Sequence, residues 1–192
     1  MIKLYYTNYI IRNNDIDFNN KSEEEARNFL FNTVNSLNDY SNDVVYNDHK
    51  KPDYIDERYH FNISHSKGLV LMGVSDTIIG VDCELIKANK NIDKLSTKIF
   101  NDNDFNYFIN DDVTTLYSIW TIKEAYLKAV GIGLVSNIKE IFIDYEKCVV
   151  TLFGYPTLNF RSCIFNGYAI TIVSKSDIED DIVNLLIHLK KD

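Results

Sequence analysis

Two apolar segments of this 192-residue chain carry carboxylates, and that placement constrains how the chain can fold. Asp82 and Glu84 lie in the segment 78–85, and Glu124 lies in the segment 115–130. A buried carboxylate without a partner is energetically costly, so the two segments are expected to meet around a shared cation. Oxygen ligands of this kind favour Mg²⁺ or Mn²⁺. The alternative is that Glu84 is solvated and Glu124 pairs with the lysine four residues later.

The segment 78–85 is predicted to be a strand that forms a hairpin with a preceding strand at 69–75. Residues two apart on a strand project from the same face, so Asp82 and Glu84 should lie side by side. Gly80 shares that face and leaves room for another element or a ligand to approach closely.

The segment 115–130 is apolar on most sides and ends at Gly131, a pattern typical of a buried helix with a glycine stop. Lys128 follows Glu124 by one turn on the same face, so it is placed to reach a phosphate held by a metal. Lys123 points about 100° away from Glu124 and is placed for a salt link.

Hydrophobic periodicity predicts the other elements. We expect strands at 2–6, 44–46, 140–144, 148–153, 157–164 and 168–173, and helices at 22–38 and 92–100. The first helix is expected to begin at Ser22, because Glu25 completes a capping-box signature with it. A C-terminal amphipathic helix is predicted from the spacing of Ile178, Ile182, Leu185, Leu186 and Leu189.

A short internal similarity suggests two related halves. The segment 68–75 resembles the segment 167–174 at an offset of 99 residues, and Phe61 and Phe160 are separated by the same offset. Many glycine-led apolar strands match this well by chance, which leaves that alternative open. If the match marks a duplication, the boundary falls near 86–92, and a ligand would bind in the cleft between the halves.

Composition restricts the class of protein. The formal net charge of −8 argues against a nucleic-acid binder, and 45% hydrophobic residues supply a soluble globular core. Cys83, Cys148 and Cys163 are odd in number and widely separated, which favours a reducing compartment over a disulfide scaffold. We expect a cytoplasmic protein without a signal peptide, a membrane span or a membrane partner.

The polar segment Asn62-Ile63-Ser64-His65-Ser66 offers hydroxyl and imidazole donors for a phosphate, or it is an ordinary turn. A serine hydrolase is unfavourable here, because His65 and its neighbouring serines point to opposite faces of a strand. Arg27, Lys51 and Asp104 have ordinary interpretations too: the first two as surface charges and the third as a helix cap.

Taken together, three motifs resemble those of the 4′-phosphopantetheinyl transferases of the Sfp-like, surfactin-synthetase-activating type. That family shows Asn-x-Ser-His-Ser, then Ile/Val-Gly-Ile/Val-Asp-x-Glu, then Trp-(Ser/Thr)-x-Lys-Glu-Ala/Ser-x-x-Lys. This chain matches them at 62–66, 79–84 and 120–128, in the same order.

The resemblance implies Mg²⁺-dependent transfer of the phosphopantetheine arm of coenzyme A to a serine of an apo acyl or peptidyl carrier protein, releasing 3′,5′-ADP. It also implies an α+β fold of two similar α/β halves, residues 1–88 and 89–192, related by pseudo-twofold symmetry around a ligand cleft. A chain of this length and type is expected to act as a monomer.

Residue roles carry over motif by motif. The resemblance implies that Asp82, Glu84 and Glu124 hold the metal, and that Glu124 and Lys128 serve in catalysis. The contacts to coenzyme A that it implies come from Arg27, Lys51, Ser64, His65, Lys123 and Lys128.

The carrier is expected to dock beside the segment 86–114. Its apolar residues there are Ile92, Leu95, Ile99, Phe100, Phe105 and Phe108. Two other functions stay open: a metal-dependent hydrolase of a nucleotide diphosphate, which would use the same acids with water, and a non-catalytic coenzyme A-binding protein.

Overall fold

The computed structural model describes residues 1–87, 92–108, 112–133 and 138–190. Its strands are β1 (Ile2–Asn8), β2 (Val44–Tyr46), β3 (Pro52–Tyr54), β4 (His60–Ser66), β5 (Leu69–Ser75), β6 (Ile79–Leu85), β7 (Phe142–Asp144), β8 (Val149–Thr151), β9 (Leu158–Phe165), β10 (Tyr168–Ser174) and β11 (Leu186–His188). Its α-helices are α1 (Ile16–Asn38), α2 (Ile92–Ile99), α3 (Asp102–Tyr107) and α4 (Val113–Val130), and short 3₁₀ turns lie at Ile138–Glu140 and Ile182–Leu185.

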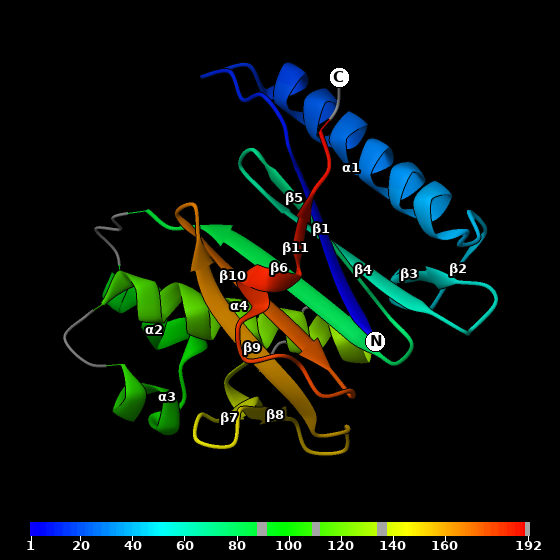
Figure 1. Ribbon diagram of the computed structural model, residues 1–192. Helices are drawn as coiled ribbons and strands as arrows, with labels where there is room; N and C mark the ends of the chain where they lie inside the picture. The colour runs from blue at the N-terminus through cyan, green and yellow to red at the C-terminus, as the bar shows by residue number, and fades with distance from the viewer. Residues whose placement is uncertain (88–91, 109–111, 134–137, 191–192) are drawn as a thin grey trace.

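Within the described residues the strands form two main sheets and a small ribbon (Figure 1). The first sheet has the order β11-β1-β5-β4, the second has the order β6-β10-β9-β8-β7, and β2 pairs with β3. This is the expected α+β class. The strands predicted at 2–6, 44–46, 140–144, 148–153, 157–164 and 168–173 and the helices predicted at 92–100 and 115–130 are confirmed to within a few residues.

The internal similarity reappears as matching strand pairing. In the hairpin β4–β5, Phe61 lies opposite Val74, and in the hairpin β9–β10, Phe160 lies opposite Val173. Both pairs are related by the offset of 99 found in the sequence. The second strand of each hairpin also pairs with a further antiparallel strand, β5 with β1 and β10 with β6. The repeated segment therefore has one register in both sheets, while the expected boundary between 88 and 89 lies outside the described residues.

The predicted hairpin of strands 69–75 and 78–85 is wrong. β5 pairs with β4 and β1, whereas β6 pairs with β10 in the other sheet. The hairpin turn is instead Lys67-Gly68, and both residues have positive φ, as a two-residue β-hairpin turn requires. The strand β4 was obscured in the sequence because its alternating polar residues suggested a loop.

Side chains of β4 join the two sheets. β4 and β6 lie side by side but belong to different sheets. Three side chains of β4 accept hydrogen bonds from backbone N–H groups of β6. The pairs are Asn62 with Val81 at 2.9 Å, Ser64 with Cys83 at 3.3 Å, and Ser66 with Leu85 at 3.1 Å. Because strand residues two apart share a face, the three acceptors form a regular ladder that holds β6 beside β4.

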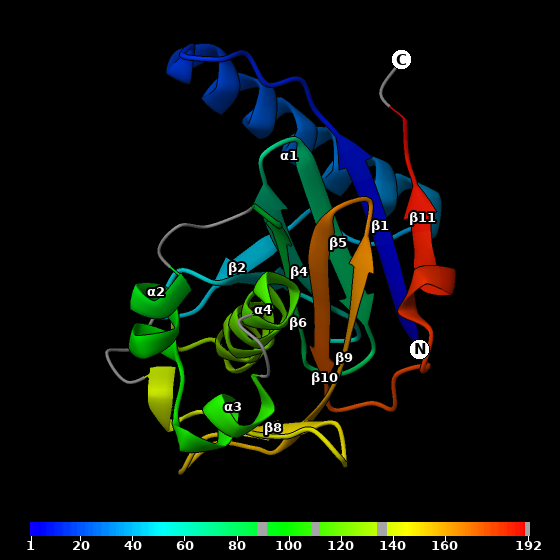
Figure 2. The same cartoon turned by 90° about the vertical axis from the view of Figure 1, so that its left-hand side faces the viewer.

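Helix α4 packs directly on β6 and β10, and α1 packs on the first sheet (Figures 1 and 2). A Cβ atom at Gly80 would lie only 2.0 Å from the carbonyl oxygen of Ala125, so glycine is required where α4 crosses β6. The expectation that Gly80 permits a close approach is confirmed, and the approaching element is α4. Each described helix is too short or too polar to span a bilayer.

Two predicted helix boundaries are corrected. Helix α1 begins at Ile16, six residues before Ser22, because the Asp15 side chain caps it by accepting the N–H of Phe18 at 3.0 Å. The predicted C-terminal helix is wrong: the segment forms a 3₁₀ turn and then β11, in which Leu186 pairs with Leu4 of β1. The open edge of β1 offers this segment backbone hydrogen bonds, while Ile182 still packs in the core.

Candidate active site

The three carboxylates singled out in the sequence come from two touching elements. Asp82 and Glu84 project from β6, and Glu124 projects from α4, which packs on β6 at Gly80. Asp82 is 4% exposed and Glu124 is 9% exposed, so neither is an ordinary solvated carboxylate. Glu84, for which solvation was the alternative, is half-buried and accepts a hydrogen bond from Ser66 Oγ at 2.7 Å.

Two oxygens of this acidic cluster lack hydrogen-bond partners. Asp82 Oδ2 and Glu124 Oε1 are both buried, and neither has a partner within the described residues. Burial, followed by the charge of Asp82, raises the pKa of Glu124 from its ordinary value of 4.5 to about 7. Burial also raises the pKa of Glu84, although the hydroxyl of Ser66 opposes the shift. The cluster therefore concentrates negative charge that its own protein environment does not fully compensate.

Lys128 is the cation nearest to this charge. Its Nζ donates to Asp82 Oδ1 at 2.6 Å and to Ser64 Oγ at 2.9 Å, while Ser64 Oγ donates to the same Asp82 oxygen at 2.8 Å. The ion pair that Lys128 makes is with Asp82, and not with Glu124 as the alternative interpretation had it. The Lys128 side chain is still 29% exposed, so its ammonium group can also meet a ligand.

The donor chemistry suits a hard divalent cation, because carboxylate oxygens are the ligands that Mg²⁺ and Mn²⁺ prefer. The two partnerless buried oxygens are where such an ion would compensate charge. As the side chains stand, no group of three His, Cys, Asp or Glu residues in the described ranges is gathered closely enough to hold an ion. Rotation of these side chains would be needed to bring the oxygens together.

A cavity of about 460 Å³ lies between α1, the β2–β3 ribbon and β4. Arg27 from α1 and His65 from β4 line it, together with Tyr46 and Pro52. His65 points away from Ser64, as expected for neighbours on a strand, and its side chain is 41% exposed. Burial and the nearby Arg27 and Lys128 lower the pKa of His65, although Glu23 opposes that shift. The structure thus brings Arg27 and His65 together on one cavity wall.

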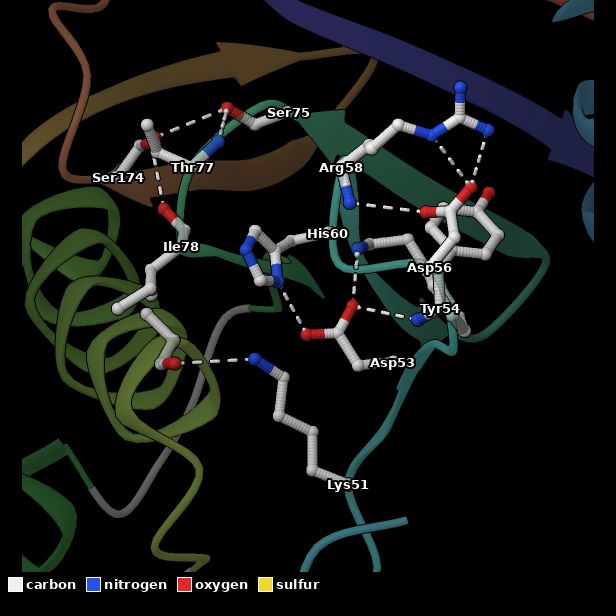
Figure 3. A network of polar contacts seen from close by, with 12 residues as sticks. Lys51, Asp53, Tyr54, Asp56, Arg58, His60, Ser75, Thr77, Ile78 and Ser174 are labelled. Atoms are coloured by element: carbon white, nitrogen blue, oxygen red, sulfur yellow. Dashed lines mark hydrogen bonds and ion pairs between the residues drawn. The ribbon is translucent and has the colours of Figure 1, made fainter. Parts of the chain in front are cut away.

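Lys51 has a different environment from the one implied by the resemblance. Its Nζ donates to the carbonyl of Ala129 at 3.2 Å, at the C-terminal end of α4 (Figure 3). Asn47 supports the same helix end by donating to the carbonyl of Gly131 at 2.8 Å. Both residues lie in the turn that joins β2 to β3. This turn therefore caps the helix that carries Glu124 and Lys128.

Lys123 is corrected from a ligand contact to a structural residue. Its side chain is fully buried, and Nζ lies 2.5 Å from Asp104 Oδ2 and 2.9 Å from the carbonyl of Ile99. Tyr145 donates to the other Asp104 oxygen at 2.8 Å. Asp104 also caps α3 through a capping box with Asn101, which confirms its interpretation as a helix cap. This buried network fixes α2 and α3 against α4 and does not face the acidic cluster.

The predicted apolar docking patch is largely internal. Ile99 and Phe100 are each 1% exposed in the core beneath α4, and Ile92, Leu95 and Phe108 pack against the same core. Among the six residues of the predicted patch, all of which the structure describes, Phe105 alone is exposed, at 45%.

Sequence reasoning placed Asn62 and Ser66 in a candidate phosphate-binding segment without identifying their partners, and it missed Glu23. Asn62 and Ser66 belong to the ladder between β4 and β6, and the alternation of polar residues in 62–66 was the available signal. Glu23 contacts both His65 and Arg27, at 3.1 and 3.7 Å. No motif marked it, because its position depends on how α1 lies across β4.

Comparison with known proteins agrees with this geometry. The family model of the 4′-phosphopantetheinyl transferase superfamily matches residues 78–173, which is half of the chain and includes β6 and α4. The chain belongs to this superfamily.

Two relatives show the extent of the similarity. The chain is 31% identical over 131 residues to the 4′-phosphopantetheinyl transferase gsp of Aneurinibacillus migulanus, covering 64% of this chain and 54% of the relative. It is 34% identical over 88 residues to the 4′-phosphopantetheinyl transferase HetI of Nostoc sp. strain PCC 7120, covering 43% of this chain and 37% of the relative. The matched regions thus span about half the length of these relatives or less.

Proposed function

We propose that this chain transfers the 4′-phosphopantetheine arm of coenzyme A to a serine of an apo acyl or peptidyl carrier protein and releases 3′,5′-ADP. The observation that carries the proposal is that Asp82, paired with Lys128, and Glu124 each keep a buried oxygen without a partner on the packed elements β6 and α4, in a member of this superfamily. Charged groups of both signs at one semi-buried place suit a reaction that moves a phosphoryl-linked group.

In this proposal coenzyme A binds in a cleft between two halves, residues 1–88 and 89–192, related by pseudo-twofold symmetry. The matching registers of the two hairpins support that relationship. Arg27 and His65 meet phosphate on the adenosine side, in the cavity that Tyr46 and Pro52 also line. Ser64 serves mainly to hold Asp82 and Lys128, given its hydrogen bonds to both.

Asp82, Glu84 and Glu124 would hold Mg²⁺, or Mn²⁺, against the diphosphate. A bound cation supplies charge neutralisation for that diphosphate. Lys128 adds a second positive charge, provided by an ammonium group already placed at Asp82. Lys51 and Lys123 act indirectly, the first by capping α4 and the second by anchoring it to Asp104.

The proposed transfer is a displacement at the β-phosphorus. The carrier serine oxygen forms a bond to this phosphorus, and the bond from the phosphorus to the oxygen it shares with the α-phosphate breaks. The leaving 3′,5′-ADP takes the electron pair. The serine proton passes to Glu124, the carboxylate proposed to activate the serine.

Incubation with coenzyme A, Mg²⁺ and a panel of apo carriers tests this function by intact mass spectrometry. The expected result is a carrier mass gain of one phosphopantetheine arm, with 3′,5′-ADP formed in equal amount. Cleavage of coenzyme A at the same rate without a carrier would instead indicate a hydrolase. Binding of coenzyme A with neither reaction, across the panel, would indicate a non-catalytic binding protein.

A further inference from the structure

Glu23 already contacts Arg27 and His65, two side chains that line the proposed phosphate cavity. It lies on α1, one helical turn before Arg27. One of its carboxylate oxygens, Oε2, lies 3.1 Å from His65 Nδ1, and the other, Oε1, lies 3.7 Å from Arg27 Nε. Tyr9 also donates its hydroxyl to Oε2 at 3.4 Å. A carboxylate of the chain thus lies between the guanidinium group of Arg27 and the imidazole of His65.

Glu23 does not satisfy the hydrogen-bond donor Nε of Arg27. Arg27 Nε is buried, and no acceptor in the described residues lies within hydrogen-bond distance of it. At 3.7 Å the Glu23 oxygen supplies charge attraction without a hydrogen bond. A phosphate has more acceptor oxygens than a single carboxylate and greater charge, so it satisfies a guanidinium group better.

A second position is available to the Glu23 side chain. Its side chain lines a second cavity, distinct from the one that Arg27 and His65 line. That second cavity is lined by three further cations, Arg12, Lys67 and Lys87. A carboxylate displaced from Arg27 and His65 therefore moves toward positive charge, which lowers the cost of displacement.

We propose that Glu23 is a specificity-determining residue: it is an internal placeholder that a ligand must displace with a terminal phosphate monoester. This inference rests on the proposed function, in which Arg27 and His65 meet the 3′-phosphate of coenzyme A. A ligand without that phosphate leaves Glu23 in place and gains little from Arg27 and His65. A ligand with it exchanges a weak internal ion pair for stronger charge-assisted hydrogen bonds.

The test compares Glu23→Gln with Glu24→Gln. Glu24 is the next residue of α1, lines the Arg27 cavity and makes no ion pair within the described residues, so its substitution removes the same charge without removing the contact. Binding of coenzyme A and dephospho-coenzyme A is measured by calorimetry at low salt. Thermal melts of each variant check that the fold is intact.

The expected result is that Glu23→Gln binds coenzyme A about threefold to fivefold more tightly than the wild type, with a smaller gain for dephospho-coenzyme A. Glu24→Gln should show a clearly smaller gain. Unchanged or weaker coenzyme A binding by Glu23→Gln, an equal gain for both ligands, or an equal effect of the two variants would overturn the inference. Failure of the wild type to bind either ligand would overturn the proposed function itself.

Discussion

Ser66 Oγ donates a hydrogen bond to the carboxylate of Glu84 at 2.7 Å and accepts the backbone N–H of Leu85 at 3.1 Å. Ser64 makes the same double contact one step earlier, to Asp82 at 2.8 Å and to the N–H of Cys83 at 3.3 Å. The side chains that join the two sheets are therefore the ones that orient the acidic pair. Any change in the spacing of β4 and β6 is transmitted to the carboxylates.

Replacing Ser66 with alanine should weaken the response to Mg²⁺. The variant loses the hydroxyl that orients Glu84 and leaves the N–H of Leu85 without its acceptor, at a cost of about 1–2 kcal/mol in unfolding free energy. We expect the Mg²⁺ concentration for half-maximal transfer to rise about threefold to tenfold. Ser162→Ala, which removes a hydroxyl bonded only within the β9–β10 sheet and to α4 through Thr171, is the matched control. An unchanged Mg²⁺ response in Ser66→Ala would remove this positioning role.

Replacing Glu124 with glutamine should abolish transfer and yet stabilise the metal-free protein at alkaline pH. The folded pKa of Glu124 is about 7 and its ordinary value is 4.5, so the folded chain retains this proton to higher pH than the unfolded chain. Stability from this group is complete below about pH 4.5 and is lost as the pH rises through about 7. At pH 8 without divalent cations, Glu124→Gln should be more stable by about 1–2 kcal/mol in urea denaturation. Equal stability at pH 8, or full transfer activity, would contradict this account of Glu124.

Replacing Lys123 with methionine should unfold the chain more readily without changing ligand recognition. The substitution leaves the fully buried Asp104 without its cation, which costs about 3–5 kcal/mol. The double variant Lys123→Met/Asp104→Asn should recover part of this loss. Protein that stays folded at low temperature should keep its KM for coenzyme A, because Lys123 lies away from the cavity. A large rise in KM at unchanged stability would restore Lys123 as a ligand contact.

Substitutions of Arg27 and of Lys51 should have different effects, the first on ligand recognition and the second on stability. Arg27→Ala should raise the KM for coenzyme A more than the KM for dephospho-coenzyme A, since Arg27 lines the cavity. Lys51→Met should instead lower the unfolding free energy by about 1 kcal/mol, because it removes a hydrogen bond from the end of α4. Equal KM effects of Arg27→Ala on both ligands would remove its role at the 3′-phosphate.

Local patterns in the sequence were sufficient to place α4 and β6 and to identify Asp82, Glu84 and Glu124 as unusual, because burial follows from hydrophobic periodicity. They were not sufficient to pair the strands. The turn after β5 suggested a local hairpin, whereas β6 pairs with β10, a strand more than eighty residues away in sequence. Long-range pairing depends on which edges are left open, and a single short segment does not contain that information.

The same limit explains the errors at the site. Asn62, Ser64 and Ser66 were interpreted as donors for a phosphate or as an ordinary turn. Their partners in the structure include backbone N–H groups of β6, which come close only in the folded chain. The burial of Lys123 depends on the position of Asp104, nineteen residues earlier, on a helix that the sequence pattern did not predict.

Cation binding tests the central claim most directly, namely that the carboxylates of β6 and α4 form one metal site. Mn²⁺ binding in the presence of coenzyme A is measured by electron paramagnetic resonance for the wild type, Asp82→Asn, Glu124→Gln and the exposed-surface control Asp17→Asn. The account predicts that the wild type and the control bind Mn²⁺ equally well, and that each of the other variants binds at least about tenfold more weakly. Wild-type affinity in both Asp82→Asn and Glu124→Gln would contradict it.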